Sequence, residues 1–189
     1  MSDALRVGVA GLGTVGASVL RILARQEAAL AARCGRPVRV TAVSARDRAR
    51  DRGVDLSGYT WFDDPVALAG SVEVDCVVEL IGGGEGTAQQ VVERALTGGK
   101  AVVTANKALL AKSGLALART AEEMRVPLAY EAAVAGGIPV IKTLRESLAG
   151  NAVSRVYGIL NGTCNYILSR METEGLSFSD CLADAQRLG

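Results

Sequence analysis

The sequence predicts an α/β fold in which helices cover both faces of a parallel sheet. From Leu5 to Tyr130, short runs rich in valine alternate with longer stretches whose apolar residues recur at helical spacing. The short runs are almost continuously apolar, which is typical of strands that are buried on both faces. This alternation of strand and helix favours a doubly wound sheet.

Each element follows from its own local pattern. Five strands are expected, at residues 5–10, 37–43, 74–81, 100–104 and 126–130. Helices are expected between them, from residue 14 to about 32, from Pro65, from 87 to about 96, and after Lys107. Pro65 suits the first position of a helix because the N–H that it lacks is not needed there.

We expect a domain boundary near Gly137, so that residues 1–137 form the parallel-sheet domain and residues 138–189 begin a second, α+β domain. The second part is expected to contain a helix at 138–148, a strand at 153–160, a helix after Asn161 and a helix at 179–188. About 50 residues are few for an independent core. Residues 138–189 are therefore expected to be an incomplete domain.

The composition excludes several classes of partner. The formal net charge is +1 and only 4% of the residues are aromatic, so neither nucleic acid nor a membrane surface is an expected partner. No apolar run approaches the ~18 residues that a transmembrane helix needs. The first strand begins almost at once, which leaves no room for a signal peptide, and we expect a cytoplasmic protein.

The absence of histidine limits the chemistry that this chain can perform. Ser-His-Asp and Cys-His catalysis and His-ligated zinc sites are excluded. Acid–base work must fall to Lys, Asp, Glu, Tyr or bound water. The four cysteines form no C-x-x-C pair, so reduced thiols are expected rather than a disulfide framework or a metal cluster.

The clearest motif is a glycine turn between the first strand and the first helix. Gly11 permits a tight turn, Gly13 lets backbone N–H groups approach a pyrophosphate, and Gly16 lets the helix pack close to the strand. Together with Thr14 and Val15 they open a helix whose N-terminus favours negative charge. The motif predicts a Rossmann-type dinucleotide site, although a glycine-rich helix entry can also be purely structural.

The end of the second strand bears on the choice of cofactor. A site for NAD places a carboxylate there, which binds the ribose hydroxyls. This chain has Ser44 instead, and we expect Arg46 to bind the 2′-phosphate of NADP with Ser44 as a further donor. NADP is therefore favoured, while NAD stays open because Asp47 can still reach a ribose. The alternative is a solvated loop on which arginines alternate with acids (Arg46, Arg48, Arg50 and Arg52).

The ends of the later strands are expected to converge on the nicotinamide. Ligands of open α/β sheets lie beyond the carboxyl ends of the strands. Ile81 ends the third strand and Gly82 follows it, Thr104 ends the fourth, and Glu131 follows the fifth. Glu79, within the apolar third strand, is ambiguous, and a buried structural carboxylate with a backbone partner is one interpretation.

Lys107 is the candidate for catalysis. It stands where the fourth strand gives way to a helix, and its ammonium group can polarise a carbonyl oxygen, neutralise a carboxylate or exchange a proton. The alternative is a surface lysine at the start of a helix. A cation is poorly placed at a helix N-terminus, which favours the functional interpretation.

Five runs of sequence, in order along the chain, resemble homoserine dehydrogenases. They are GVAGLGTVG, VVELIGG, TANKALLA, YEAAVAGGIP and GILNGTCNYIL, and the resemblance covers essentially all 189 residues. The last run is far more specific than the glycine turn. The resemblance implies a Rossmann-type domain followed by the beginning of a substrate and dimerisation domain. It also implies interconversion of L-homoserine and L-aspartate 4-semialdehyde with NAD(P), within threonine, methionine and isoleucine synthesis.

The resemblance implies roles for individual residues as well. Lys107 matches a lysine near the nicotinamide and the substrate. A structural sodium ion is implied at four residues, the last three of which bind through backbone carbonyls (Glu131, Val134, Gly136 and Ile138). Oxygen ligands suit such a hard cation, and a glycine-rich hinge is the alternative.

The second-domain signature is matched by Asn161, Gly162 and Thr163, together with Asn165. In the family these residues lie near the amino-acid substrate and the dimer interface, so the resemblance implies a homodimer in the intact enzyme. The alternative is that Asn161 and Gly162 form a turn and that Thr163 caps a helix.

The sequence departs from the family at its end. Homoserine dehydrogenases continue beyond the position of Gly189 with the segment that holds the substrate's amino group and with an Asp and Lys pair assigned to proton transfer. We therefore expect an N-terminal portion of a longer enzyme, which binds cofactor better than it turns over substrate. Two alternatives are a nucleotide-sensing module without catalysis and another Rossmann dehydrogenase acting on sugars or polyols. The NGTxNY run argues against the latter.

Overall fold

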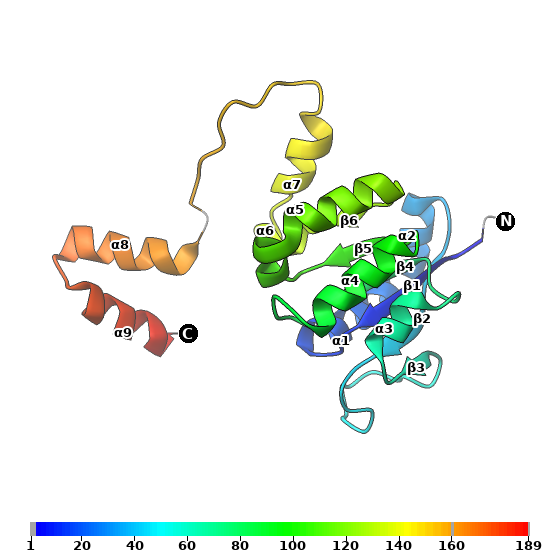
Figure 1. Cartoon of the computed structure of the whole chain (residues 1–189). Coiled ribbons are helices and arrows are strands. Elements are labelled where there is room, and N and C mark those ends of the chain that lie inside the picture. The colour runs from blue at the N-terminus through cyan, green and yellow to red at the C-terminus, as the bar shows by residue number, and fades with distance from the viewer. Residues whose placement is uncertain (1–2, 160, 189) are drawn as a thin grey trace. The chain divides into compact units, whose positions relative to one another are not determined.

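The computed structural model describes residues 3–159 and 161–188 of the chain. It divides into two compact units, Met1–Thr143 and Leu144–Gly189 (Figure 1). The division lies somewhat later in the chain than the boundary expected near Gly137.

The first unit contains a sheet of six parallel strands in the order β3-β2-β1-β4-β5-β6. Its strands are β1 (Leu5–Ala10), β2 (Val38–Ser44), β3 (Thr60–Phe62), β4 (Cys76–Glu79), β5 (Ala101–Thr104) and β6 (Leu128–Ala129). Five of them lie where the sequence predicts strands. The prediction missed β3, because three residues between polar loops are too few to show a strand pattern.

The helices of this unit follow the predicted alternation. They are α1 (Thr14–Arg25), α2 (Glu27–Cys34), α3 (Pro65–Gly70), α4 (Thr87–Thr97) and α5 (Lys107–Met124). The single helix expected from residue 14 to about 32 is wrong in one respect, since the backbone leaves the helical region at Gln26 and separates α1 from α2. The predicted start of α3 is confirmed: the Asp64 carboxylate accepts a hydrogen bond from the Val66 N–H at 2.8 Å. Within the described part of the chain, no helix combines the length and the apolar character needed to cross a membrane.

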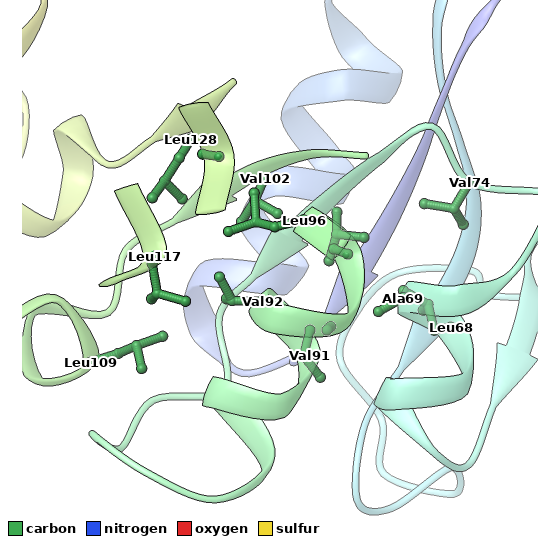
Figure 2. Close-up of a cluster of buried hydrophobic side chains, with 14 of the residues drawn as sticks. Leu68, Ala69, Val74, Val91, Val92, Leu96, Val102, Leu109, Leu117 and Leu128 are labelled. Carbon is green, nitrogen blue, oxygen red and sulfur yellow. The ribbon is translucent and has the colours of Figure 1, made fainter. Parts of the chain in front are cut away.

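Apolar side chains on both faces of the sheet form the core. On one face α3, α4 and α5 contribute buried residues such as Leu68, Val92 and Leu117, which belong to one apolar cluster with Val102 of β5 (Figure 2). On the other face Leu20 of α1 packs against buried valines of β1 and β2. Helices thus cover both faces, and the predicted doubly wound α/β fold is confirmed.

An ion pair joins β1 to the chain just before β4, at the edge of the sheet opposite the glycine turn. The Arg6 guanidinium donates from Nε and Nη2 to the two carboxylate oxygens of Asp75, at 3.0 and 2.5 Å. These hydrogen bonds lower the pKa of Asp75 below its usual value. The pair helps to hold the two central strands in register.

The segments after β6 are short helices and then a helical pair. They are α6 (Glu131–Val134), α7 (Val140–Lys142), a π-helical turn (Thr143–Ser147), α8 (Gly162–Glu174) and α9 (Phe178–Leu188). Residues 138–148 are therefore helical only in part. In the second unit, the Arg170 guanidinium of α8 donates to Asp184 of α9 at 2.5 Å and joins the pair.

The strand expected at residues 153–160 is wrong for residues 153–159, which form no strand in the structure; Leu160 lies outside the described residues. A strand exists only when its N–H and C=O groups pair with a second strand. Residues 151–159 are exposed and pair with no other described segment, and Tyr157 is 90% exposed. The β-branched pattern alone does not supply such a partner.

Candidate functional site

The glycine turn connects β1 to α1 in a backbone path that only glycine permits. Gly11 has φ +103°, and a Cβ atom there would lie 2.5 Å from the carbonyl oxygen of Leu80. A Cβ on Gly16 would overlap the carbonyl oxygen of Gly11. The N–H of Gly11 donates to the Ser44 carbonyl at 2.9 Å, which ties the turn to the end of β2. These close approaches explain why glycine occupies the first and last positions of the motif.

Gly13 has a different role in the turn. It is the N-cap of α1, and it has no side chain that could accept a hydrogen bond from the N–H groups of the first helical turn. A Cβ at this position would meet no atom within 4 Å. The N-terminus of α1 therefore presents backbone donors and a favourable dipole to open space, as an anion-binding helix does.

A cavity of about 410 Å³ lies at this helix start, at the carboxyl ends of the strands. It brings together five of the residues that the sequence assigns to the cofactor: Gly11, Gly13, Ser44, Arg46 and Ile81. Thr14, Val15 and Gly16 follow directly in α1. The walls of the cavity do not include Gly82, Thr104 or Lys107.

Three arginines and two aspartates line the cavity beyond β2 and β3, in the positions Arg46, Arg50, Arg52, Asp47 and Asp63. The side chains of Arg46 and Arg50 are exposed and form no hydrogen bond or ion pair with any residue that the structure describes. An anion in the cavity therefore meets two cations that have no carboxylate partner. Only Arg46 of these was expected in the site. The alternation of arginine along the loop does not separate Arg50 and Arg52, which line the cavity, from Arg48, which does not.

Buried polar groups organise the ends of β4 and β5. Glu79 is fully buried, and its Oε1 accepts hydrogen bonds from the N–H groups of Ile81 and Gly82 at 2.8 and 3.2 Å. Its Oε2 accepts from the Thr104 hydroxyl at 2.6 Å. Glu79 is thus a buried structural carboxylate with backbone partners, which is the interpretation that the sequence offered.

Asn106 extends this network to the start of α5. Its N–H donates to the Thr104 hydroxyl at 3.0 Å, and its side-chain amide donates to the Gly83 carbonyl at 2.7 Å. Its Oδ1 caps α5 by accepting from the Leu109 N–H at 3.1 Å. Lys107, the first residue of α5, is exposed and has no polar partner in the described part of the chain. The network consequently fixes the backbone on which Lys107 stands and leaves its ammonium group free.

The four residues of the implied sodium site lie in and after α6. Each carboxylate oxygen of Glu131 accepts a backbone N–H, from Ile141 at 2.9 Å and from Lys142 at 2.8 Å. Val134, Gly136 and Ile138 are exposed, and the Ile138 carbonyl accepts from the Val140 N–H at 2.8 Å. Because a carboxylate oxygen can accept more than one hydrogen bond, Glu131 keeps capacity for a cation.

Asn161, Gly162 and Thr163 form the start of α8 in the second unit. The helix cap is Asn161, whose Oδ1 accepts from the Cys164 N–H at 2.8 Å. The alternative that Thr163 caps the helix is therefore wrong. Asn has the same short acceptor geometry as Thr and stands one residue before the helix, where an N-cap belongs.

We predict that Glu79→Met lowers the free energy of unfolding by about 3 kcal/mol or more, because three buried donors lose their acceptor. Glu79→Gln is expected to cost about 1 kcal/mol, since its amide oxygen still accepts the two backbone N–H groups. Urea unfolding followed by circular dichroism measures both. Equal costs for the two variants would contradict the network described above.

Two family models match the chain. The model described as the NAD-binding domain of homoserine dehydrogenase matches residues 11–131, and the model described as homoserine dehydrogenase matches residues 139–189. The first match contains the glycine turn, the cavity and Lys107. The second contains α8 and its cap.

Curated relatives and solved structures agree with these matches. The homoserine dehydrogenase of Mycobacterium tuberculosis is 49% identical over 97% of this chain, and that of Corynebacterium glutamicum is 46% identical over 99%. A crystal structure of a homoserine dehydrogenase from Thiobacillus denitrificans has a TM-score of 0.85 and 43% identity, and it covers 99% of this chain.

This chain spans 41% and 42% of the two curated relatives and 43% of the solved chain. The shared part carries the Rossmann-type sheet and the cavity at its carboxyl edge. Since the cofactor-domain match alone covers residues 11–131, more than half of the 189 residues, the chain belongs to the homoserine dehydrogenase family.

Proposed function

We propose that this chain binds a nicotinamide dinucleotide in the cavity at the start of α1, as the cofactor part of a homoserine dehydrogenase. The observation that carries the proposal is the open helix N-terminus at Gly13, where a Cβ would meet no atom and where backbone donors face the cavity. The reaction would interconvert L-homoserine and L-aspartate 4-semialdehyde. The cofactor, when bound, supplies the group that takes up or releases the hydride.

NADP is the preferred form of the cofactor in this proposal, with NAD as the alternative. Arg46 and Arg50 line the cavity without carboxylate partners, and Ser44 occupies the strand end where a site for NAD has a carboxylate. A planar guanidinium binds a phosphate through two parallel hydrogen bonds. Asp47 also lines the cavity, which is the feature that keeps NAD open.

The remaining roles belong to Ile81 of the cavity wall and to residues outside the cavity. Lys107 would hold its cation near the reacting oxygen, supported by its exposure and by the fixed backbone at the start of α5. Ile81, Gly82 and Thr104 would shape the nicotinamide end of the site, Thr104 through its buried hydroxyl. Asn161, Gly162 and Thr163 would contribute to the substrate side.

A structural sodium ion, a homodimer and a cytoplasmic location complete the proposal. The sodium ion would use the Glu131 carboxylate and the backbone oxygens of Val134, Gly136 and Ile138, an oxygen set that suits a hard cation. The homodimer rests on the resemblance of the second unit to the family's dimerisation domain. The cytoplasmic location is proposed because the four cysteines form no C-x-x-C pair and no disulfide framework is expected from their spacing.

The activity is tested with the protein at the length of its curated relatives. Reduction of NADP⁺ that depends on L-homoserine is expected, followed by the absorbance of the reduced nicotinamide. Lys107→Met should lower the rate at least about a hundredfold while NADPH binding stays within about twofold, because the ammonium group acts only on the reacting oxygen. An unchanged rate would remove Lys107 from catalysis. The absence of any homoserine-dependent reduction in the unsubstituted protein would contradict the proposed reaction.

The cofactor preference is tested on the 189-residue chain by fluorescence titration with NADPH and NADH. Arg46→Ala is expected to weaken NADPH binding about tenfold and NADH binding by less than about twofold, because only NADPH carries the 2′-phosphate. Arg48→Ala is the matched control, since Arg48 lies on the same loop but not in the cavity. An unchanged ratio of the two affinities in Arg46→Ala would contradict the assignment of Arg46.

A further inference from the structure

One arginine beside the cavity is held by three backbone carbonyls. The Arg52 guanidinium donates from Nε to the Leu12 carbonyl at 3.0 Å, from Nη1 to the Arg50 carbonyl at 2.6 Å and from Nη2 to the Asp47 carbonyl at 2.5 Å. Each of the three guanidinium nitrogens therefore donates a hydrogen bond. No other guanidinium in the described part of the chain has this set of partners.

These carbonyls belong to two different segments. Leu12 is inside the glycine turn, whereas Asp47 and Arg50 lie on the loop of residues 45–59 that joins β2 to β3. The backbone of Arg52 itself is tied to α1, because its carbonyl accepts from Nη1 of Arg21 at 3.4 Å. Arg52 thus joins the phosphate-facing turn to the loop that carries Arg46.

Apolar contacts hold the two ends of the loop, since Ala45 at one end and Val54, Leu56 and Tyr59 at the other pack against the buried cluster on β1 and β2. The guanidinium groups of Arg48 and Arg52 lie 5.7 and 5.9 Å from the centre of the Trp61 ring, and the Trp61 indole N–H donates to Asp63 at 2.8 Å. Most of the loop is exposed, including Arg46 and Arg50. Among the side-chain hydrogen bonds of the described residues, the one from Arg52 Nε to the Leu12 carbonyl joins the exposed middle of this loop to the glycine turn, and the other two fix the loop's own backbone.

The charge of Arg52 is not neutralised by these contacts. Its partners are carbonyls, and it forms no ion pair with any described residue. We call the three hydrogen bonds of Arg52 to backbone carbonyls the Arg52 clamp. Hydrogen bonds to carbonyls hold the loop and leave the positive charge of Arg52 in place, whereas an ion pair with a carboxylate would neutralise that charge. This combination suits a loop that receives an anionic group.

We propose that Arg52 is a positioning residue for the cofactor: it holds loop 45–59 against the glycine turn, so that Arg46 and Arg50 face a phosphate in the cavity. The inference deepens the proposed function and rests on the binding of a phosphate-bearing dinucleotide there. Arg52 acts through the loop and does not itself bind the phosphate. A lysine at this position would keep the positive charge, but it would lack the planar guanidinium group whose three nitrogens donate to the three carbonyls.

Limited proteolysis with trypsin tests the clamp without any cofactor. The loop carries the cleavage sites after Arg46 and Arg50, and cleavage there reports how often the loop opens. In Arg52→Lys we expect cleavage after these two residues, measured by mass spectrometry, to be at least about fivefold faster than in the unsubstituted chain. Arg48→Gln is the matched control: it removes a loop cation and the same kind of Trp61 contact but no carbonyl hydrogen bond, and its rate should stay within about twofold.

Fluorescence titration with NADPH then tests the consequence for binding. Arg52→Lys should weaken NADPH binding about tenfold although the net charge is unchanged, and Arg48→Gln should weaken it by less than about threefold. Arg52→Gln, which also lacks the guanidinium group, should open the loop to trypsin as Arg52→Lys does. Circular dichroism melting shows whether each variant keeps the fold.

Three results would overturn the proposal. Cleavage in Arg52→Lys at the control rate would mean that no clamp exists. Faster cleavage with unchanged NADPH affinity would mean that the clamp does not position the binding groups. Weaker binding with unchanged cleavage would make Arg52 a direct ligand instead. If the unsubstituted chain binds no dinucleotide, the proposed function fails, and the cleavage rates still decide whether Arg52 closes the loop.

Discussion

No side chain fits at residues 11 and 16 of the glycine turn. The carbonyl oxygen of Leu80 occupies the space of a Cβ at residue 11, and the carbonyl oxygen of Gly11 occupies that of a Cβ at residue 16. Because of this close approach, α1 starts directly at the carboxyl edge of the sheet, between the ends of β1, β2 and β4. The helix start then faces a cavity and not the core. The anion-binding character of the site follows from this placement, since the unpaired N–H groups and the helix dipole point the same way.

Two sets of hydrogen bonds stabilise the two sides of this turn. On the side of β4 and β5, Glu79, Thr104 and Asn106 hold the loops that lead to Lys107. On the side of β2, Arg52 holds the loop that carries Arg46. The residues of the first set are buried, whereas Arg52 is only partly buried. We therefore infer that the side proposed for the nicotinamide is rigid, whereas the side proposed for the adenosine phosphate is held by fewer buried contacts.

The spacing of apolar residues along the sequence predicted the strands and helices that are long enough to show a repeat. The glycine turn could be predicted because the close approach of backbone segments requires glycine. The apolar spacing missed β3, which exists because its three residues pair with β2. The strand expected at 153–160 failed for the converse reason, since residues 153–159 have the composition of a strand but no partner. The proposed role of Arg52 depends on the closeness of the Leu12 and Asp47 carbonyls in the folded chain. The spacing of these residues along the sequence does not predict that closeness.

In the proposed function, the backbone at Gly13 receives the phosphates of a dinucleotide. Gly13→Val tests it most directly, because Gly13 has φ −73° and the added side chain would point into open space, so the fold should survive. We predict a melting temperature within about 5 °C of the unsubstituted chain, together with a loss of NADPH affinity of about a hundredfold or more in fluorescence titration. An unchanged affinity in a folded Gly13→Val variant would contradict this account of the site.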